Sequence, residues 1–166
     1  VIQNPFSTND YAVITGTISD SGGITKTGNG RLVLTGNNTF TGGITMYSGI
    51  VQGADAALNL NLPNQALIFG GTNNGTSGVI QSSGNLNFDG LGTGAGQVSW
   101  LANSSGGFAA IGGALSVTLT TDTATPITWG ATSFLNGVSE LVLSSTSADN
   151  VVTWNNAINL GAATRT

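Results

Sequence analysis

Ten charged side chains are the strongest candidates for chemistry in this 166-residue sequence, because it contains neither histidine nor cysteine. Their absence excludes disulfides, thiolate chemistry, haem ligation by histidine and every nucleophile that a histidine activates. The seven acids stand singly along the chain, each next to a small or turn-forming residue, which is typical of turns rather than of a catalytic pair. These acids are Asp10, Asp20, Asp55, Asp89, Asp122, Glu140 and Asp149.

Two kinds of enzyme could use such charges. A glycoside hydrolase needs two carboxyl groups about 5 Å apart to retain configuration, or about 6.5–9.5 Å apart to invert it. No spacing among the acids forces such a pair. A solenoid lyase uses a basic residue to abstract a proton, and only Lys26 and Arg31 could serve. We therefore predict no catalytic residue and no enzymatic activity.

Metal and cofactor sites are equally hard to place. A calcium loop alternates acidic residues around a glycine, whereas Gly70–Gly78 supplies glycines without an aspartate. Gly90–Gly96 has glycine at every second position, which is not the G-x-G-x-x-G spacing of a phosphate-binding turn. The sequence predicts no metal and no cofactor, and calcium held by carbonyls and one carboxylate is the open alternative.

The charge balance also limits the partners. Three cations and a net charge of −4 argue against nucleic acid, whose phosphates require a basic surface. No apolar run reaches about 18 residues, so we expect no segment that inserts into a membrane. The sequence begins without an initiator methionine or a signal segment, so we expect a mature fragment or an excerpt of a longer chain.

The composition predicts an all-β fold. Apolar residues make up 39% of the chain and come in short β-branched bursts, with 26 glycines and many asparagine, serine and threonine residues between them. Many short strands joined by tight turns have this composition. The best helical candidate is Ala54–Leu58, which is one turn at most.

An internal repeat narrows the architecture. The sequence of Val13–Gly16 returns with one change in Val33–Gly36, and that of Gly22–Thr25 returns in Gly42–Thr45, at the same offset along the chain. A β-solenoid coil with three short strands and three turns takes about 20 residues, which is this offset, whereas a propeller blade needs about 40–50. We expect a β-solenoid whose strands pair in parallel from coil to coil.

Alternation along the expected strands assigns the core and the corners. Glycine pairs at 22–23, 42–43, 70–71 and 112–113 are expected at corners that need positive φ. Inward side chains are expected to stack in ladders from one coil to the next. They include Val13, Ile24, Leu32, Leu34, Ile44, Ile50, Leu67, Phe69, Ile80, Leu86 and Phe88.

Three tryptophans recur in the second half of the chain. Trp100, Trp129 and Trp154 each end a triplet that reads apolar, hydroxyl, tryptophan. Alternation places the first and third side chains of such a triplet on one face of a strand. This pattern favours an inward aromatic ladder, and an outward strip that stacks on carbohydrate is the alternative.

The segment Gly22–Gly53, about a fifth of the chain, resembles the passenger-associated repeat of bacterial autotransporters. That family's pattern runs roughly G-x-L-x-K-x-G-x-G-x-L-x-L-x-G-x-N-x-Y-x-G-x-T, and Phe40 stands at its aromatic position. The resemblance implies a right-handed parallel β-helix, secreted and displayed outside a bacterial cell. The matching residues are Lys26, Gly28, Gly30, Leu32, Leu34, Gly36, Asn38, Gly42 and Thr45.

We expect one continuous module with two parts. Residues 1–96 would form glycine-rich coils of about 20 residues that include the passenger-type repeat. Residues 97–166 would continue the solenoid with longer strands, Leu115–Leu119 and Val138–Leu143 among them, and Gly90–Gly96 is the nearest to a joint. The segment Gly90–Thr166 resembles the spacer of giant tandem-repeat surface proteins of the same broad class.

The predicted function is structural. We expect a stalk, spacer or filament module on the bacterial cell surface that stacks end to end with further copies of itself or with adjacent repeats. The alternative is an adhesin that binds surface glycans or neighbouring cells through the loops Leu58–Asn64 and Thr121–Pro126. A polysaccharide-degrading enzyme is the third possibility and requires an acidic pair in a groove.

Overall fold

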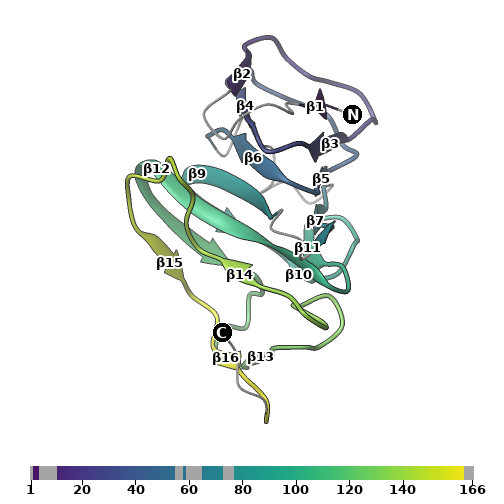
Figure 1. Cartoon of the computed structure of the whole chain (residues 1–166), viewed down its shortest axis with the longest axis vertical. Coiled ribbons are helices and arrows are strands. Elements are labelled where there is room, and N and C mark those ends of the chain that lie inside the picture. The colour runs from purple at the N-terminus through teal and green to yellow at the C-terminus, as the bar shows by residue number, and fades with distance from the viewer. Residues whose placement is uncertain (1, 4–10, 55–57, 59–64, 73–76, 163–166) are drawn as a thin grey trace.

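The computed structural model describes residues 2–3, 11–54, 58, 65–72 and 77–162. Nearly all regular structure in these residues is β-strand, which confirms the all-β prediction (Figure 1). Leu58 ends the expected helical turn, and its N–H donates to the Ala54 carbonyl at 3.0 Å, while residues 55–57 lie outside the described ones. The described part of the chain contains no helix long and apolar enough to cross a membrane.

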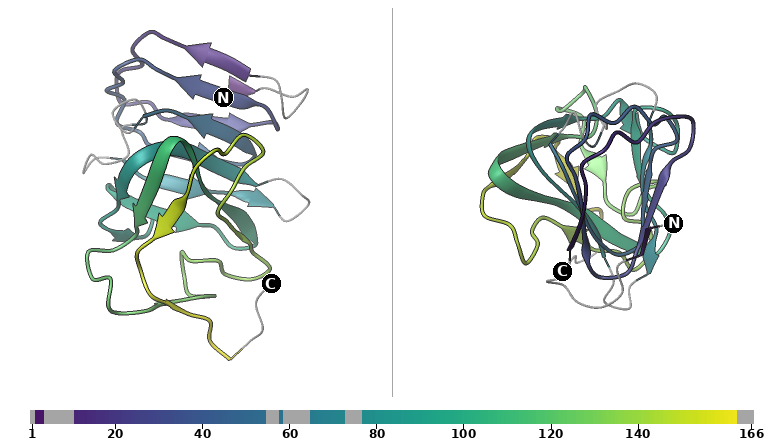
Figure 2. Two further views of the ribbon diagram at one scale, coloured as in Figure 1. Left: turned by 90° about the vertical axis from the view of Figure 1, so that its left-hand side faces the viewer. Right: turned by 90° about the horizontal axis from the view of Figure 1, so that it is seen from above.

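Two sheets make up most of the molecule, and within each sheet the strands follow one another along the long axis (Figure 2). The first has the order β1 (Ile2–Gln3), β3 (Ile24–Thr27), β5 (Ile44–Met46), β7 (Leu67–Phe69), β11 (Gln97–Trp100) and β10 (Gly90–Leu91). The second has the order β2 (Tyr11–Ile14), β4 (Arg31–Leu34), β6 (Gly49–Gln52), β9 (Gly78–Asn87), β12 (Ser104–Thr118) and β14 (Leu141–Val142).

Four shorter strands complete the structure. β15 (Val152–Trp154) pairs in parallel with the second half of β12, whereas β14 pairs with the first half of β12. β13 (Ile127–Thr128) and β16 (Ile158–Asn159) form a small parallel pair at the C-terminal end. β8 (Gly71–Thr72) is antiparallel to the start of β12. The strands of the two main sheets otherwise pair in parallel, as predicted for a solenoid.

The length of chain between neighbouring coils grows along the molecule. In the N-terminal coils, Ile24 pairs with Ile44, and the separation of these two residues equals the offset of the sequence repeat. The side chain of Asn38 likewise forms a hydrogen bond with Ile18, 20 positions earlier in the chain. Toward the C-terminus the side chain of Asn156 makes the corresponding bond to Leu119 across 37 positions. A coil of the predicted length therefore describes the N-terminal coils and not the whole chain.

Inward side chains form the predicted ladders. One runs through Ile24, Ile44, Leu67 and Val98, which face one another in successive strands of the first sheet. Another runs through Leu32, Val51, Ile80 and Phe108 in the second sheet. Nine of the eleven residues expected inside belong to the main buried cluster: Ile24, Leu32, Leu34, Ile44, Leu67, Phe69, Ile80, Leu86 and Phe88.

The other two expected core residues face outward. Val13 is 48% exposed, because it pairs with Val33 on the outer face while Ile14 and Leu34 point inward. Ile50 is buried, but on the outer face, where it packs with Val79 and Ala109 in a separate cluster. Both errors arise because adjacent residues of these strands are apolar, so alternation alone does not fix the phase.

The glycine pairs serve the corners in two different ways. Only Gly43 and Gly112 among the four pairs have positive φ, at 79° and 69°. Gly23 instead allows close approach between coils, since a Cβ there would come within 2.6 Å of the Gly42 carbonyl oxygen. The expectation of positive φ in every pair is therefore wrong, and coil contact explains part of the glycine content.

Residues 143–150, which we call the strap, lie across the outer face of the second sheet. Ala148 packs on the outer cluster of Ile50, Val79 and Ala109. The N–H of Asp149 donates to the Ala110 carbonyl at 3.1 Å, and the Asp149 carboxylate accepts from the Gly112 N–H at 2.8 Å. Sequence alternation predicts a strand over Val138–Leu143, but only Leu141–Val142 pair as β14, and Val138 is 75% exposed.

Candidate functional site

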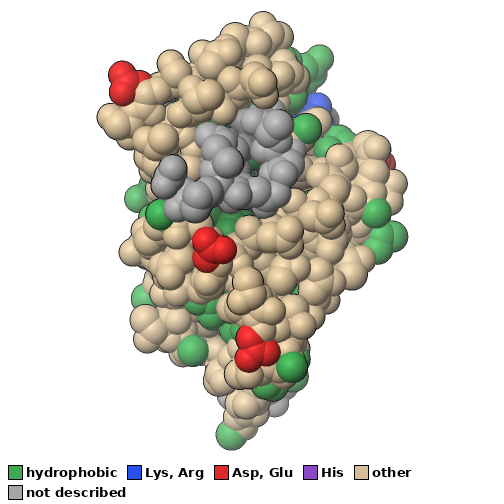
Figure 3. All heavy atoms as spheres, turned by 180° about the vertical axis from the view of Figure 1, so that it is seen from behind, with side chains coloured by type: hydrophobic (Ala, Val, Ile, Leu, Met, Phe, Trp, Pro, Cys, Tyr) green, Lys and Arg blue, Asp and Glu red, His purple; other side chains and the backbone are tan. Residues whose placement is uncertain are grey.

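Three acidic side chains, those of Asp20, Asp122 and Asp149, accept hydrogen bonds from backbone N–H groups in turns or loops. Asp20 has a φ of 86° and accepts from the Ser21 N–H at 2.7 Å, and Asp149 ties the strap to Gly112. The acids visible on one face of the molecule stand apart (Figure 3). No group of three or more possible metal-ligating side chains occurs among the described residues. Asp10 and Asp55 lie outside the described residues.

The loop Thr121–Pro126, expected as an adhesive turn, is exposed and organised by Asp122. The Asp122 carboxylate accepts from the N–H groups of Ala124 and Thr125, both at 3.1 Å. These hydrogen bonds, with one from the Thr125 side chain, lower the pKa of Asp122. In the other expected loop, Leu58 is fully buried, and residues 59–64 lie outside the described ones.

Lys26 is a fully buried cation in the passenger-like segment. Its Nζ donates to the carbonyl oxygens of Thr27 and Gly28, at 2.9 and 2.6 Å, and to that of Ser48 in the next coil, at 3.3 Å. Gly49 comes so close that a Cβ there would lie 2.6 Å from Nζ. Lys26 therefore fastens the turn after β3 to the turn after β5.

Burial lowers the pKa of Lys26 from 10.5 to about 8. The three carbonyl contacts act in the opposite direction, because they favour the charged ammonium. The amine has backbone carbonyl oxygens of Thr27, Gly28 and Ser48 as its hydrogen-bond partners. The arrangement fits a structural role for Lys26.

Two further residues of the segment hold adjacent coils together. The side-chain oxygen of Asn38 accepts from the backbone N–H of Ile18 at 2.8 Å, and Asn38 is buried at a corner. Gly36 lies against the preceding coil, where a Cβ would overlap the carbonyl oxygen of Gly16. Phe40 fills the core beside this corner. The expected pattern thus corresponds to a set of coil-to-coil contacts.

The three tryptophans point inward, as predicted. Trp100 is buried and donates its indole N–H to the Gly106 carbonyl at 3.0 Å, while Trp129 and Trp154 are half-buried against the same core. The Phe134 ring lies 5.4, 6.1 and 6.0 Å from the rings of Trp100, Trp129 and Trp154. Burial of this kind disfavours the outward strip for stacking sugars.

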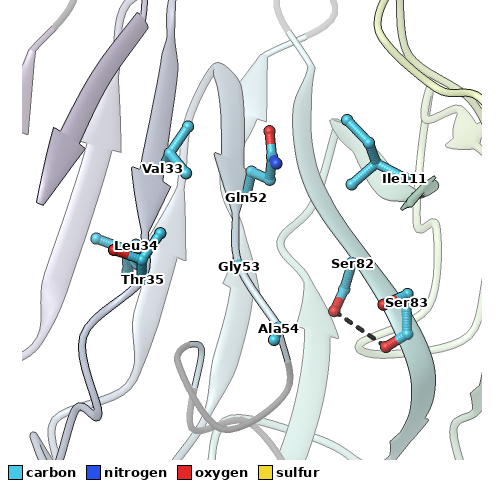
Figure 4. Close-up of a pocket in the computed structure, with 9 residues that line it drawn as sticks. All are labelled: Val33, Leu34, Thr35, Gln52, Gly53, Ala54, Ser82, Ser83 and Ile111. Carbon is cyan, nitrogen blue, oxygen red and sulfur yellow. Dashed lines mark hydrogen bonds between the residues drawn. The ribbon is translucent and has the colours of Figure 1, made fainter. Parts of the chain in front are cut away.

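An open hollow of about 240 Å³ lies on the outer face of the second sheet. Gly53 contributes only backbone to its lining. Val33 from β4 and Ile111 from an irregular stretch of β12 stand on opposite sides of it (Figure 4). The irregularity lies between Ala110 and Leu115, where the register with β9 shifts.

Leu34 and Ala54 also line the hollow, and the remaining lining residues carry hydroxyl or amide groups. Thr35, Gln52, Ser82 and Ser83 contribute them, and Ser82 donates its hydroxyl to the Ser83 carbonyl at 3.3 Å (Figure 4). The Oε1 atom of Gln52 is buried and has no hydrogen-bond partner among the described residues. A buried acceptor without a donor costs folding free energy, and this oxygen has almost no surface open to the hollow.

Sequence reasoning missed both the hollow and the strap. A signal was present: Gly49–Gln52 reads GIVQ and its partner Gly78–Gln81 reads GVIQ, and the two strands pair residue for residue. This repeat places Gln52 and Gln81 side by side on the outer face. Ser145 of the strap is hydrogen-bonded to Gln81, although it lies 64 positions further along the chain. No local sequence pattern predicts this contact.

The comparisons with known proteins agree with this geometry. Residues 24–52 match the model of the passenger-associated-transport-repeat family. The match spans the strands β3, β4, β5 and β6 and includes Lys26, Gly36, Asn38 and Phe40. Neither the curated proteins nor the solved structures give a significant match. Residues 24–52 are thus similar to the autotransporter passenger repeat, as the sequence predicted, and this repeat implies a secreted or cell-surface protein.

Proposed function

We propose that this chain is a structural module, a spacer or stalk, of an extracellular bacterial surface protein with a right-handed parallel β-helical fold. The observation that carries the proposal is the position of the passenger-type repeat. Its strands continue without a break into the parallel sheets on either side, so the repeat is one part of a longer stack. A repeat built into a stack in this way extends a rod.

The bonding of the stack supports a mechanical role. Backbone hydrogen bonds between coils run along the long axis, and side-chain contacts such as those of Lys26 and Asn38 reinforce them. The interior is a continuous apolar cluster from Ile24 to Leu135, and burial of such surface contributes about 25 cal/mol per Å². Rigid length is the property that this arrangement supplies.

We further propose that the neighbours of this module are copies of itself or adjacent repeats, placed end to end. The N-terminal coil supports this, because Ala12 is exposed while its register partner Leu32 is buried. β2 is also the last strand of its sheet in the described residues, and its outer edge can accept another parallel strand. A coil stacked on β2 would bury Ala12 and satisfy that edge.

Immunogold electron microscopy of cells that make the protein natively tests the location and the shape. We expect label outside the cell, on rod-like projections, when the antibody is raised against residues 11–162. Label confined to the cell interior, or to compact particles without a rod, would contradict the proposal.

A replacement experiment separates a spacer from an adhesin. The module is exchanged in the full-length protein for an unrelated β-solenoid of equal length, and an epitope beyond it is probed on intact cells. A spacer predicts unchanged access of the antibody to the epitope and unchanged attachment of the cells. Loss of attachment with the epitope still accessible would assign adhesion to this module instead.

A further inference from the structure

We propose that the N-terminal face of the chain docks one coil of an adjacent repeat, a short coil of the passenger type. We call residues 11–30 the first coil and residues 31–50 the second coil. The N-terminal face consists of β2, at one end of the second sheet, and of the corner that follows it, residues 15–23 (Figure 1). The inference rests on the proposed end-to-end stacking and adds which neighbour fits this face and what it supplies.

Two glycines on the face have no use within the described chain. Gly16 and Gly22 lack a positive φ, and a Cβ at either would meet no described atom within 4 Å. Their equivalents in the second coil have no such room. A Cβ at Gly36 would overlap the Gly16 carbonyl oxygen, and one at Gly42 would lie 2.6 Å from the Gly22 carbonyl carbon. Because glycine loses the most backbone freedom on folding, its recurrence at Gly16 and Gly22 points to the backbone of a preceding coil.

Three backbone N–H groups on the face have no acceptor among the described residues. Their equivalents in the second coil donate to carbonyl oxygens of the first coil, at 3.0, 2.8 and 3.3 Å, and belong to Thr35, Thr39 and Gly42. The groups without a described acceptor belong to Thr15, Ser19 and Gly22, which are exposed. A coil that stacks on the first coil as the first stacks on the second would supply the three carbonyl oxygens.

Two positions of the first corner differ from the second, and they limit what holds the neighbour. Ile18 stands where the second coil has Asn38, so the amide bond between corners is not repeated on this face. The Asp20 carboxylate accepts from the Ser21 N–H at 2.7 Å, so this donor needs no acceptor from a neighbour. We therefore expect backbone hydrogen bonds and apolar contact to hold the docked coil.

The apolar surface of the first coil is only partly covered. Ile14 and Ile18 pack against the main core cluster but are half-buried, and Ala12 is exposed. The register partners of Ala12 and Ile14, which are Leu32 and Leu34, are each 1% exposed. A coil with inward apolar side chains would cover all three residues. A lone extended peptide would pair with β2 but leave the corner uncovered, so a whole coil fits the face better than a strand.

The length of the corner selects the kind of coil. Residues 15–23 and 35–43 match position for position, because the strands on both sides of these corners pair at one offset. A neighbour with a corner of equal length would continue this pattern and place a carbonyl oxygen at each donor. The segment that matches the passenger-associated-transport-repeat family, residues 24–52, contains such a corner. An adjacent repeat of this type is therefore the occupant that fits.

Hydrogen exchange followed by mass spectrometry tests the docking in the protein as cells make it. A peptide covering residues 15–23 is compared between that protein and the isolated 166-residue chain. We expect it to exchange at least about tenfold more slowly in the natural protein, because its free N–H groups become bonded. Residues 35–43 are the control and should exchange alike in both, since their N–H groups are already bonded to the first coil.

Equal exchange of residues 15–23 in the two proteins would overturn the proposal. It would leave the extracellular spacer role standing, because location and epitope access test that role separately. Slower exchange in β2 without a change in residues 15–23 would show that a single strand is the occupant. Protection of the isolated chain that rises with its concentration would show that a second copy is the occupant. Either result would overturn the adjacent repeat as the partner.

A tandem duplication of residues 11–30 tests whether a short coil fits the face. Gly16→Ala is made either in the inner copy, next to Arg31, or in the outer copy. We expect the inner substitution to lower the urea midpoint about as much as Gly36→Ala does in the parent chain, because its Cβ would meet the added coil. The outer substitution is the matched control and should leave the midpoint unchanged. Equal midpoints of the two variants would mean that the added coil does not dock, and would overturn the proposal.

Discussion

Lys26 is held by backbone oxygens from two coils, and the free energy of this contact is open to measurement. Lys26→Met keeps a long side chain in the core but removes the hydrogen bonds that Nζ donates to the carbonyls of Thr27, Gly28 and Ser48. We expect the free energy of unfolding to fall by about 2 kcal/mol, the scale of hydrogen bonds to a charged group. Urea denaturation at pH 7 measures it.

The neighbouring Thr25→Val is the control for this substitution, because Thr25 points away from the core on the same strand and should change stability little. A Lys26→Met variant as stable as the wild type would show that the cost of burying the charge cancels its hydrogen bonds.

The same side chain predicts a dependence of stability on pH. The pKa of Lys26 is about 8 in the folded chain and 10.5 in an exposed lysine, so the unfolded chain binds the proton more tightly between these values. The cost of burying the charge is present below about pH 8 and disappears toward pH 10.5. The free energy of unfolding of the wild type, minus that of Lys26→Met, should therefore rise over this range.

Denaturation curves of both proteins at pH 7, 9 and 10.5 measure that difference. A difference that falls as the pH rises would mean that the carbonyl contacts hold the folded pKa above 10.5.

At the scale of elements, some glycines let neighbouring coils approach each other backbone to backbone. Gly36 and Gly16 stand one above the other in adjacent coils, yet only Gly36 lacks room for a side chain. Gly36→Ala forces its Cβ into the Gly16 carbonyl oxygen, and we expect a loss of about 1–3 kcal/mol in the free energy of unfolding. Thermal or urea unfolding measures it.

Gly16→Ala is a closely matched control, because a Cβ at Gly16 would meet nothing within 4 Å. Its stability should stay within about 0.5 kcal/mol of the wild type, as for surface substitutions. Equal effects of the two substitutions would show that backbone conformation, and not contact between coils, explains both glycines.

The elements also show what sequence can and cannot predict. The repeat of Val13–Gly16 in Val33–Gly36 predicted the pairing of β2 with β4, because similar coils stack in register. Val13 and Ile50 were misplaced, since both faces of their strands carry apolar residues. The repeat of Gly49–Gln52 in Gly78–Gln81 could have placed Gln52 beside Gln81, but the strap could not be predicted, because it joins residues distant in sequence.

At the scale of the whole molecule, the described strands of the second sheet are paired and covered to different degrees. β9 and β12 make the most extensive strand pairing, and the strap and Val142 cover their outer face, whereas β2 has one bonded neighbour among the described strands. We expect the amides of Ile80 and Phe108 to exchange with solvent at least about tenfold more slowly than those of Val13 and Ile14.

Hydrogen exchange followed by NMR measures these rates residue by residue. Uniform rates would mean that the chain opens only as a whole, and faster exchange at Ile80 than at Val13 would contradict the described stacking.

The number of residues in a coil differs between the N-terminal and the C-terminal part of the described chain. A circuit near the N-terminus takes 20 positions, whereas a circuit toward the C-terminus is nearly twice as long and takes 37 positions. A second copy translated along the long axis would set a coil with few residues against a coil with many. Under the proposed end-to-end stacking, we therefore expect the N-terminal coil to match an adjacent repeat with short coils better than the C-terminal coils of a second copy.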